Sequence, residues 1–400
     1  AENAYKIINT LKWAIRTTGT RFGTMAVAVW NSGDLPTPDF SADTYTLHSD
    51  LKSMNDSNAD LLDGLYDIET NDSTDSEEAD ISFFSEQQVI RMLNGYSKKI
   101  PLGTTATLIA IDSATDKGRC SIVTYLELDG KILLENISRW HQQAEWRHKK
   151  WIIDPDTSKR KKIVFTGVPG IKDIANLVYG KEIEENGYRI IGFRASDKNK
   201  NRYFKQTADK LIPCIWYNRP IPYDIVKKII DNAMSPSLYN EPKNWERIVS
   251  LACSFYKKYI YDKKGEVLTM ALNKESHDRS YLFGRYLAVA DYAEKKTYDF
   301  KKDAKRVTNA KRYLDRFLKK PAETYLIIRQ KVEPYLTKHN HYMREKVINP
   351  LFAEIANMMD ENSFISNEKL TPMFLLGYDS QMYDLYEAEK NRKKDKDTDA

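Results

Sequence analysis

The sequence predicts an α+β protein, with a mixed α/β domain over residues 1–220 that holds an antiparallel β-meander, followed by an all-helical C-terminal bundle over residues 221–400. Three observations support this prediction. At roughly 150 residues per domain, a chain of 400 residues suggests two or three units. Hydrophobic residues make up 41% of the chain, which is enough for buried cores. Strand-like runs stop near Pro220, and only helical periodicity follows.

The first domain begins with a predicted amphipathic helix, because Ala4, Ile7 and Leu11 recur at helical spacing. A β-type run at Phe22–Trp30 follows. A Ser/Gln capping box then predicts a short helix at Ser85–Leu93.

Further strands are expected to form the meander. Strand-like runs at Thr105–Ile111 and Cys120–Leu128 are separated by turn-forming residues. Asp129-Gly130 is a typical hairpin turn, so we expect another strand at Lys131–Leu134. Together with the earlier run, these segments predict a sheet of four strands.

The second domain is expected to contain only helices, punctuated by prolines. The predicted helices lie near Tyr223–Ala233, Pro242–Tyr261, Ser276–Lys296, Asp303–Lys319, Ala322–Lys338, Met343–Met359 and Asn367–Lys390.

An acidic segment over residues 50–80 stands out, with eleven acids against one base. The net charge of the chain is +5, so the rest of the molecule is distinctly basic. The segment has little to bury and is predicted to be a mobile, solvated loop. A competitor of nucleic acid for a basic face is the alternative.

Several classes of protein are excluded or disfavoured. No apolar run reaches the roughly 18–20 residues of a membrane span, which excludes an integral membrane protein. Three cysteines without a CxxC pair favour a reducing, cytoplasmic location. No Walker loop, GxGxxG, GxSxG or HExxH motif occurs, so we expect no catalytic residue, no metal and no cofactor.

A basic stripe is predicted on the helix Asp303–Lys319. At 100° per residue, five cations share one side of this helix while apolar residues share the other. The stripe would extend about 27 Å at 1.5 Å per residue, which is enough for several phosphates of a strand. A solvated basic face is the alternative. The five cations are Lys301, Lys305, Arg312, Arg316 and Lys319.

Aromatic rings and cations are interleaved at Trp146–Trp151, where Arg147, Lys149 and Lys150 are candidate contacts to nucleic acid. Bases that stack on rings and phosphates that bind cations use this combination. For the nearby Trp140 we favour a core position instead, because it shares a helix face with Ile137.

Two short basic runs are expected to be exposed loops. The run at residues 159–162 contributes Lys161 and Lys162 as candidate contacts to a nucleic-acid backbone. A similar loop cluster is formed by Lys198, Lys200 and Arg202.

Several stretches, in order along the chain, carry a resemblance to a known family. The stretches are Ala4–Leu11, Val29-Trp30, Leu108–Tyr125, Arg139-Trp140-His141 with Trp146-Arg147-His148, Ser280–Val289 and Phe374–Tyr378. No single motif is decisive, but together they cover most of the chain and resemble the large subunit of type I-C CRISPR surveillance complexes (type I-C Cascade). We also expect Arg285, inside one of these stretches, to contact nucleic acid.

The resemblance implies a non-catalytic subunit that acts with a guide RNA, which reads the target by base pairing. Such a subunit helps to recognise the short motif beside the target (the PAM), binds double-stranded target DNA, stabilises the R-loop with its displaced single strand, and recruits a helicase-nuclease. Its other partners would be the Cascade backbone subunits and the small subunit, which the helical end resembles. Members usually carry a further N-terminal region, part of which we expect to be missing here. A metal-dependent nuclease and a purely structural assembly subunit are the alternatives.

Met270 is a candidate internal translation start. The resemblance implies that the small subunit is an internal product of the large-subunit gene, and Gly265-Glu266 can be encoded by a purine run that would suit ribosome binding. The same residue pair is also common before a helix.

Overall fold

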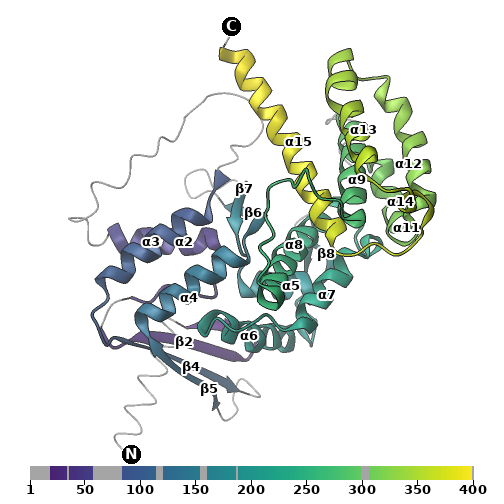
Figure 1. Cartoon of the computed structure of the whole chain (residues 1–400). Coiled ribbons are helices and arrows are strands. Elements are labelled where there is room, and N and C mark those ends of the chain that lie inside the picture. The colour runs from purple at the N-terminus through teal and green to yellow at the C-terminus, as the bar shows by residue number, and fades with distance from the viewer. Residues whose placement is uncertain are drawn as a thin grey trace, which may run out of the picture. The chain divides into compact units, whose positions relative to one another are not determined.

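The computed structural model describes residues 19–33, 36–56, 83–113, 120–153, 160–185, 188–298 and 306–398. The chain divides into two compact units (Figure 1). Unit 1 comprises residues 1–185 and 190–223, and unit 2 comprises residues 186–189 and 224–400. The α+β class is confirmed, because strands concentrate in the first half and residues 224–298 and 306–398 contain helices and no strand.

The four-stranded antiparallel sheet of unit 1 has the order β1-β2-β4-β5. Its predicted run Phe22–Trp30 is a hairpin, in which a turn at Gly23-Thr24 separates two strands. Gly23 has a φ of +68°, and a Cβ there would lie 2.4 Å from the Asn201 carbonyl oxygen, so glycine is required. The strands are β1 (Thr20–Phe22), β2 (Met25–Asn31), β4 (Thr105–Ser113) and β5 (Cys120–Asp129).

The expected hairpin at Asp129-Gly130 is wrong. Asp129 ends β5, and its carboxylate accepts hydrogen bonds from the backbone N–H groups of Lys131 (2.9 Å) and Ile132 (3.2 Å). It therefore caps the N-terminus of helix α4 (Gly130–Gln143), and the predicted strand Lys131–Leu134 is the first turn of that helix. The same Asp-Gly pair serves either role, and the apolar residues Leu133 and Ile137, both buried, select the helix.

A second sheet, with the order β3-β7-β6, was not anticipated. The basic run at residues 159–162 largely lies in β7 rather than in an exposed loop, so that expectation is also wrong. A two-stranded sheet pairs β8 with β9. The strands are β3 (Phe83–Phe84), β6 (Trp146–Ile153), β7 (Arg160–Gly167), β8 (Lys181–Glu185) and β9 (Tyr188–Gly192).

Helices pack around these sheets to form the core of unit 1. Trp216 is fully buried, its ring meets Phe40 edge-on at 5.7 Å, and its carbonyl accepts a hydrogen bond from Asn136 at 2.9 Å. Trp140 is also buried, as expected. The helices are α2 (Thr44–Asp56), α3 (Glu86–Lys99), α4 (Gly130–Gln143), α5 (Ile171–Tyr179) and α6 (Lys200–Trp216).

The helices of unit 2 follow the predicted pattern closely. The described part of the predicted helix Asp303–Lys319 is the exception, since it is divided at Tyr313. The elements are α7 (Tyr223–Ala233), η1 (Pro236–Leu238), α8 (Pro242–Lys264), α9 (Arg279–Lys295), α10 (Asn309–Arg312), α11 (Leu314–Lys319), α12 (Pro321–Leu336), η2 (Met343–Ile348), α13 (Asn349–Met358), α14 (Glu361–Ile365) and α15 (Met373–Thr398).

Helices α9 and α15 cross in backbone contact at the centre of unit 2. A Cβ on Gly284 would lie 2.1 Å from the carbonyl oxygen of Phe374, and a Cβ on Gly377 would lie 2.1 Å from that of Tyr281. Only glycine allows this approach. Both glycines lie in stretches that carry the type I-C resemblance, so those two stretches form the crossing of α9 and α15.

Some sequence-based predictions fall outside the described residues. These are the helix around Ala4–Leu11 and most of the acidic segment, from residue 57 to residue 80. The beginning of that segment, residues 50–56, is helical and belongs to α2, so it is not part of a loop.

Candidate nucleic-acid interface

The described part of the basic stripe lies on α10 and α11, and it keeps the predicted division into two faces. Arg312, Arg316 and Lys319 are exposed. The apolar face is buried, with Leu314 and Phe317 at most 1% exposed. Burial of this face explains why the short helices form and why the cations point outward. Lys301 and Lys305 lie outside the described residues.

The described part of the stripe is short and has acidic neighbours. Its cations, from Arg312 to Lys319, extend about 10 Å at 1.5 Å per residue. Two of them have acidic neighbours, with Lys319 2.7 Å from Asp315 and Arg316 3.5 Å from Glu323. The described part of the stripe therefore carries both signs of charge. All four side chains are at least 40% exposed, and such exposed pairs contribute only about 0–1 kcal/mol. A phosphate could replace either carboxylate at little cost.

Lys311, which precedes this surface, belongs to the core. Its ammonium lies 2.7 Å from Glu246 and 3.7 Å from Asp291, and its side chain is 11% exposed. Burial alone would lower the pKa of Lys311, but the two carboxylates outweigh it and raise the pKa above its usual range. Tyr378 and Thr308 donate hydrogen bonds to the same Asp291, which completes a buried polar cluster.

Arg285 is also in the core, which corrects its assignment to a nucleic-acid surface. Its side chain is 0% exposed and forms an ion pair with Glu354 at 2.6 Å. The Nε atom donates to Gln381 at 3.0 Å. These bonds link α9 to α13 and α15, so the residue holds the bundle together. The sequence around Arg285 gave no sign that its side chain is buried. Helix α9 is buried on all sides, so it has no separate apolar and polar faces from which the position of Arg285 could be judged.

The aromatic and basic cluster of unit 1 lies on strand β6. The side chain of Trp146 is described, whereas that of Trp151 lies outside the described part of the structure. Trp146 is fully buried and is therefore a core residue, with the guanidinium of Arg147 5.5 Å from its ring centre. Lys149 is exposed. Lys150 forms an ion pair with Asp43 and donates to Thr46 at 3.0 Å, which ties β6 to the start of α2.

The remaining predicted contacts lie on β7 and α6. Lys161 and Lys162 pair in register with Ile152 and Trp151 of β6, and their side chains lie outside the described part of the structure. In the other predicted loop cluster, Lys200 begins helix α6.

A buried polar contact that the sequence did not reveal joins α2, α4 and β7. The Thr44 hydroxyl lies 2.7 Å from Nδ1 of His141 and accepts the backbone N–H of Val168 at 2.8 Å. Burial lowers the pKa of His141 to about 4, although nearby Asp43 opposes this shift. A Cβ on Gly167 would lie 2.0 Å from the same hydroxyl, so this position requires glycine. Both partners are fully buried, which makes the contact structural.

In the described part of the chain, no group of three or more His, Cys, Asp or Glu side chains is arranged to hold a metal ion. Within the same ranges, no helix has the length and apolar character needed to cross a membrane.

Comparison with known proteins identifies the family. No curated protein matches the chain. The family model described as CRISPR-associated protein (Cas_Csd1) matches residues 1–386, which is nearly the whole chain. This match agrees with the resemblance to the type I-C Cascade large subunit. The chain therefore belongs to the Csd1 family of CRISPR-associated proteins and is a Cascade subunit.

Proposed function

We propose that this chain is the non-catalytic large subunit of a guide-RNA-directed DNA surveillance complex. It binds target DNA beside the recognised motif, stabilises the R-loop and recruits a helicase-nuclease. The match of the family over residues 1–386 supports membership of the complex. Support for the strand contact comes from the exposed cations Arg312, Arg316 and Lys319 on the helical unit.

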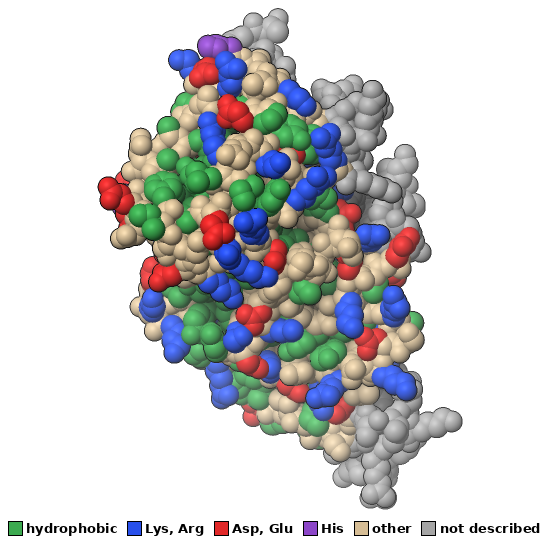
Figure 2. Space-filling model, turned by 90° about the vertical axis from the view of Figure 1, so that its right-hand side faces the viewer, with side chains coloured by type: hydrophobic (Ala, Val, Ile, Leu, Met, Phe, Trp, Pro, Cys, Tyr) green, Lys and Arg blue, Asp and Glu red, His purple; other side chains and the backbone are tan. Residues whose placement is uncertain are grey.

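The charge of the surface explains how these cations would act. Lys and Arg are intermixed with Asp and Glu on the face shown in Figure 2. At the stripe, Asp315 lies beside Lys319 and Glu323 beside Arg316, so binding would depend on local exchange, in which a phosphate takes the place of one of these carboxylates. Each phosphate contact releases counterions, so affinity falls as salt rises.

The test compares two triple variants of the full chain in the assembled complex. The first, called the stripe variant, is Arg312→Glu, Arg316→Glu and Lys319→Glu. The control reverses three other exposed lysines of unit 2 and therefore changes the net charge equally: Lys274→Glu, Lys331→Glu and Lys369→Glu.

We expect the stripe variant to assemble normally but to release the displaced strand. With single-stranded DNA, the slope of log K against log salt should fall by about 0.7 for each lost phosphate contact, or about two in total. The control should keep the parent slope. Equal slopes for the stripe variant and the parent would remove the strand contact from the proposal.

The two alternatives make different predictions. A metal-dependent nuclease would cut labelled DNA when the purified chain is given Mg²⁺ or Mn²⁺. If the chain were a purely structural subunit, the salt slope for single-stranded DNA would be the same in the parent chain, the stripe variant and the control variant. Cleavage by the purified chain would reject the non-catalytic assignment.

A further inference from the structure

A second basic surface lies on unit 1, on one side of helix α6. Between Arg194 and Lys210 the sequence has six bases and two acids, which gives a net charge of +4 over 17 residues. Arg194, Lys198 and Arg202 are exposed. None of these cations lies in the predicted stripe, which belongs to unit 2.

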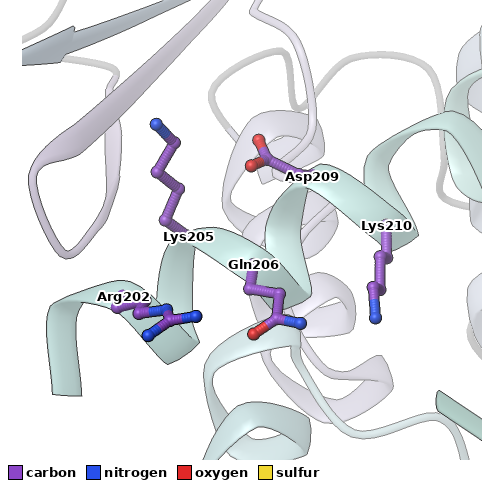
Figure 3. A pocket seen from close by; sticks show the side chains of 5 residues that line it. All are labelled: Arg202, Lys205, Gln206, Asp209 and Lys210. Carbon is purple, nitrogen blue, oxygen red and sulfur yellow. The ribbon is translucent and has the colours of Figure 1, made fainter. Parts of the chain in front are cut away.

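The solvent side of α6 is hollowed. An open hollow of about 270 Å³ lies against one side of this helix. Figure 3 shows the side chains that line it, projecting from successive turns of α6. They offer cationic and amide donors around a single carboxylate. The lining residues are Arg202, Lys205, Gln206, Asp209 and Lys210.

One lysine of this set has a structural partner. Lys205 forms an ion pair with Asp112 of β4, which also accepts a hydrogen bond from the Thr24 hydroxyl at 2.7 Å. The ion pair fixes α6 against the four-stranded sheet and raises the pKa of Lys205. The position of the hollow is therefore set by the fold, while Arg202 remains exposed at its rim.

Partly exposed aromatic rings lie on and beside α6, with Tyr203 next to the lining residues and Phe204 on the other side of the helix. The ring of Tyr203 is stacked on Tyr179 at 4.7 Å and 5°, and on Phe193 at 5.7 Å and 16°. Phe204 meets Phe193 edge-on, and the ammonium of Lys200 lies 6.0 Å from the Phe204 ring centre. All four rings are only partly buried.

The geometry of α6 brings rings and cations together. Tyr203 and Lys210 are seven residues apart, so they lie within about 20° of one line along the helix. Arg202 lies about 100° from Tyr203 and faces the hollow. Flat apolar surfaces beside cations are what proteins use for single strands, since rings stack on bases while cations meet phosphates.

We propose that this side of α6 is a second binding surface for single-stranded nucleic acid. Phosphates bind Arg202 and Lys210, one nucleotide occupies the hollow, and a base packs against the ring cluster. This inference rests on the proposed function for the class of ligand but depends on different residues in the other unit. Asp209 is the only acid that lines the hollow, so its charge opposes the bound strand.

The experiment measures binding of the full chain to fluorescent 12-nucleotide oligo(U) RNA and oligo(dT) DNA over a series of salt concentrations. The double variant Arg202→Glu with Lys210→Glu is compared with Lys52→Glu and Lys98→Glu, two exposed lysines of the same unit. A third variant is Asp209→Asn. Urea denaturation establishes that each variant folds, and Arg202→Gln replaces the double variant if it does not.

We expect the double variant to lose roughly tenfold or more in affinity and to lower the salt slope by about 1.4, at about 0.7 per phosphate contact. Asp209→Asn should bind roughly two- to fivefold more tightly, because a like charge is removed beside the phosphates. A surface that does not contact the strand would not produce this gain. The stronger of the RNA and DNA arms identifies the strand.

Two results would overturn the inference. In the first, the double variant binds as tightly as the control variants, while the stripe variant still loses affinity. The α6 surface is then not a nucleic-acid contact, and the proposed function stands. In the second, polyglutamate competes as well as the oligonucleotides do, which assigns the surface to an acidic protein. Loss of binding only in the double variant would instead leave the α6 surface and reject the stripe.

Discussion

Replacing Gly284 by alanine tests whether the close crossing of α9 and α15 organises unit 2. The new Cβ would lie 2.1 Å from the Phe374 carbonyl oxygen and 2.7 Å from the Tyr378 nitrogen. Both are backbone atoms, so a side chain cannot simply rotate away and the helices must separate. Overpacking of this kind costs about 1–3 kcal/mol. The better helix propensity of alanine returns about 1 kcal/mol. Because both clashing atoms are backbone, we expect a cost of about 2–3 kcal/mol, in the upper part of that range, and hence a net loss of about 1–2 kcal/mol in the free energy of unfolding.

A matched substitution separates the clash from helix propensity. Gly95 lies inside α3, and a Cβ there would have no atom within 4 Å. Gly95→Ala should therefore stabilise its helix by about 0.5–1 kcal/mol. Both variants are measured by urea denaturation followed by far-ultraviolet circular dichroism. If Gly284→Ala were as stable as the parent, or gained as much as Gly95→Ala, α9 and α15 would not be in backbone contact.

Three further predictions concern buried or functional positions. Glu354→Ala should cost about 3–5 kcal/mol in urea denaturation, because it leaves the buried guanidinium of Arg285 without a counter-charge, whereas Arg285→Met should cost less because Glu354 is 40% exposed. The pKa of His141 is about 4 in the folded protein and 6.5 ordinarily, so the contribution of neutral His141 to the free energy of unfolding is complete above pH 6.5 and is lost as the pH falls to 4. This loss of about 3 kcal/mol should be absent from His141→Gln. Parallel profiles of the free energy of unfolding against pH for the variant and the parent would contradict it. Met270→Leu should abolish a short C-terminal product in immunoblots with little change in the stability of the full chain, because Met270 lies outside the helices and its backbone carbonyl, which accepts a hydrogen bond from the Ser380 hydroxyl, is kept in the variant; a short product that persists would reject this start.

The sequence predicted those parts of the fold that depend on local periodicity. The helix Tyr223–Ala233 was predicted with the observed bounds, since its apolar residues repeat every three or four positions. The strands β4 and β5 were predicted from strand-like runs separated by turn-forming residues, and their first residues agree with the structure. What failed was the choice between two local structures of similar cost, as at Asp129, where the carboxylate caps a helix instead of closing a hairpin.

Long-range partners account for the errors in the candidate site. Nothing near Arg285 in the sequence indicates Glu354 or Gln381, which are brought to it by helices far along the chain. The same holds for Lys150, whose partner Asp43 is 107 residues away. Charge and periodicity show which side chains could face solvent, but the pairing of buried charges is decided by tertiary contacts.

The neighbours Lys311 and Arg312 show how this changes the expected binding strength. Successive residues on a helix are 100° apart, so one can enter the core while the next faces solvent. Lys311 is neutralised by Glu246 and Asp291, and Arg316 and Lys319 have carboxylates beside them. The local charge counted from the sequence thus overestimates the field at the surface. Binding by α10 and α11 should involve two or three phosphates. At about 0.7 per contact, these helices alone give a salt slope near two. A steeper slope in the parent chain requires further cations, for which the predicted contacts Lys301 and Lys305 and the α6 surface are the candidates.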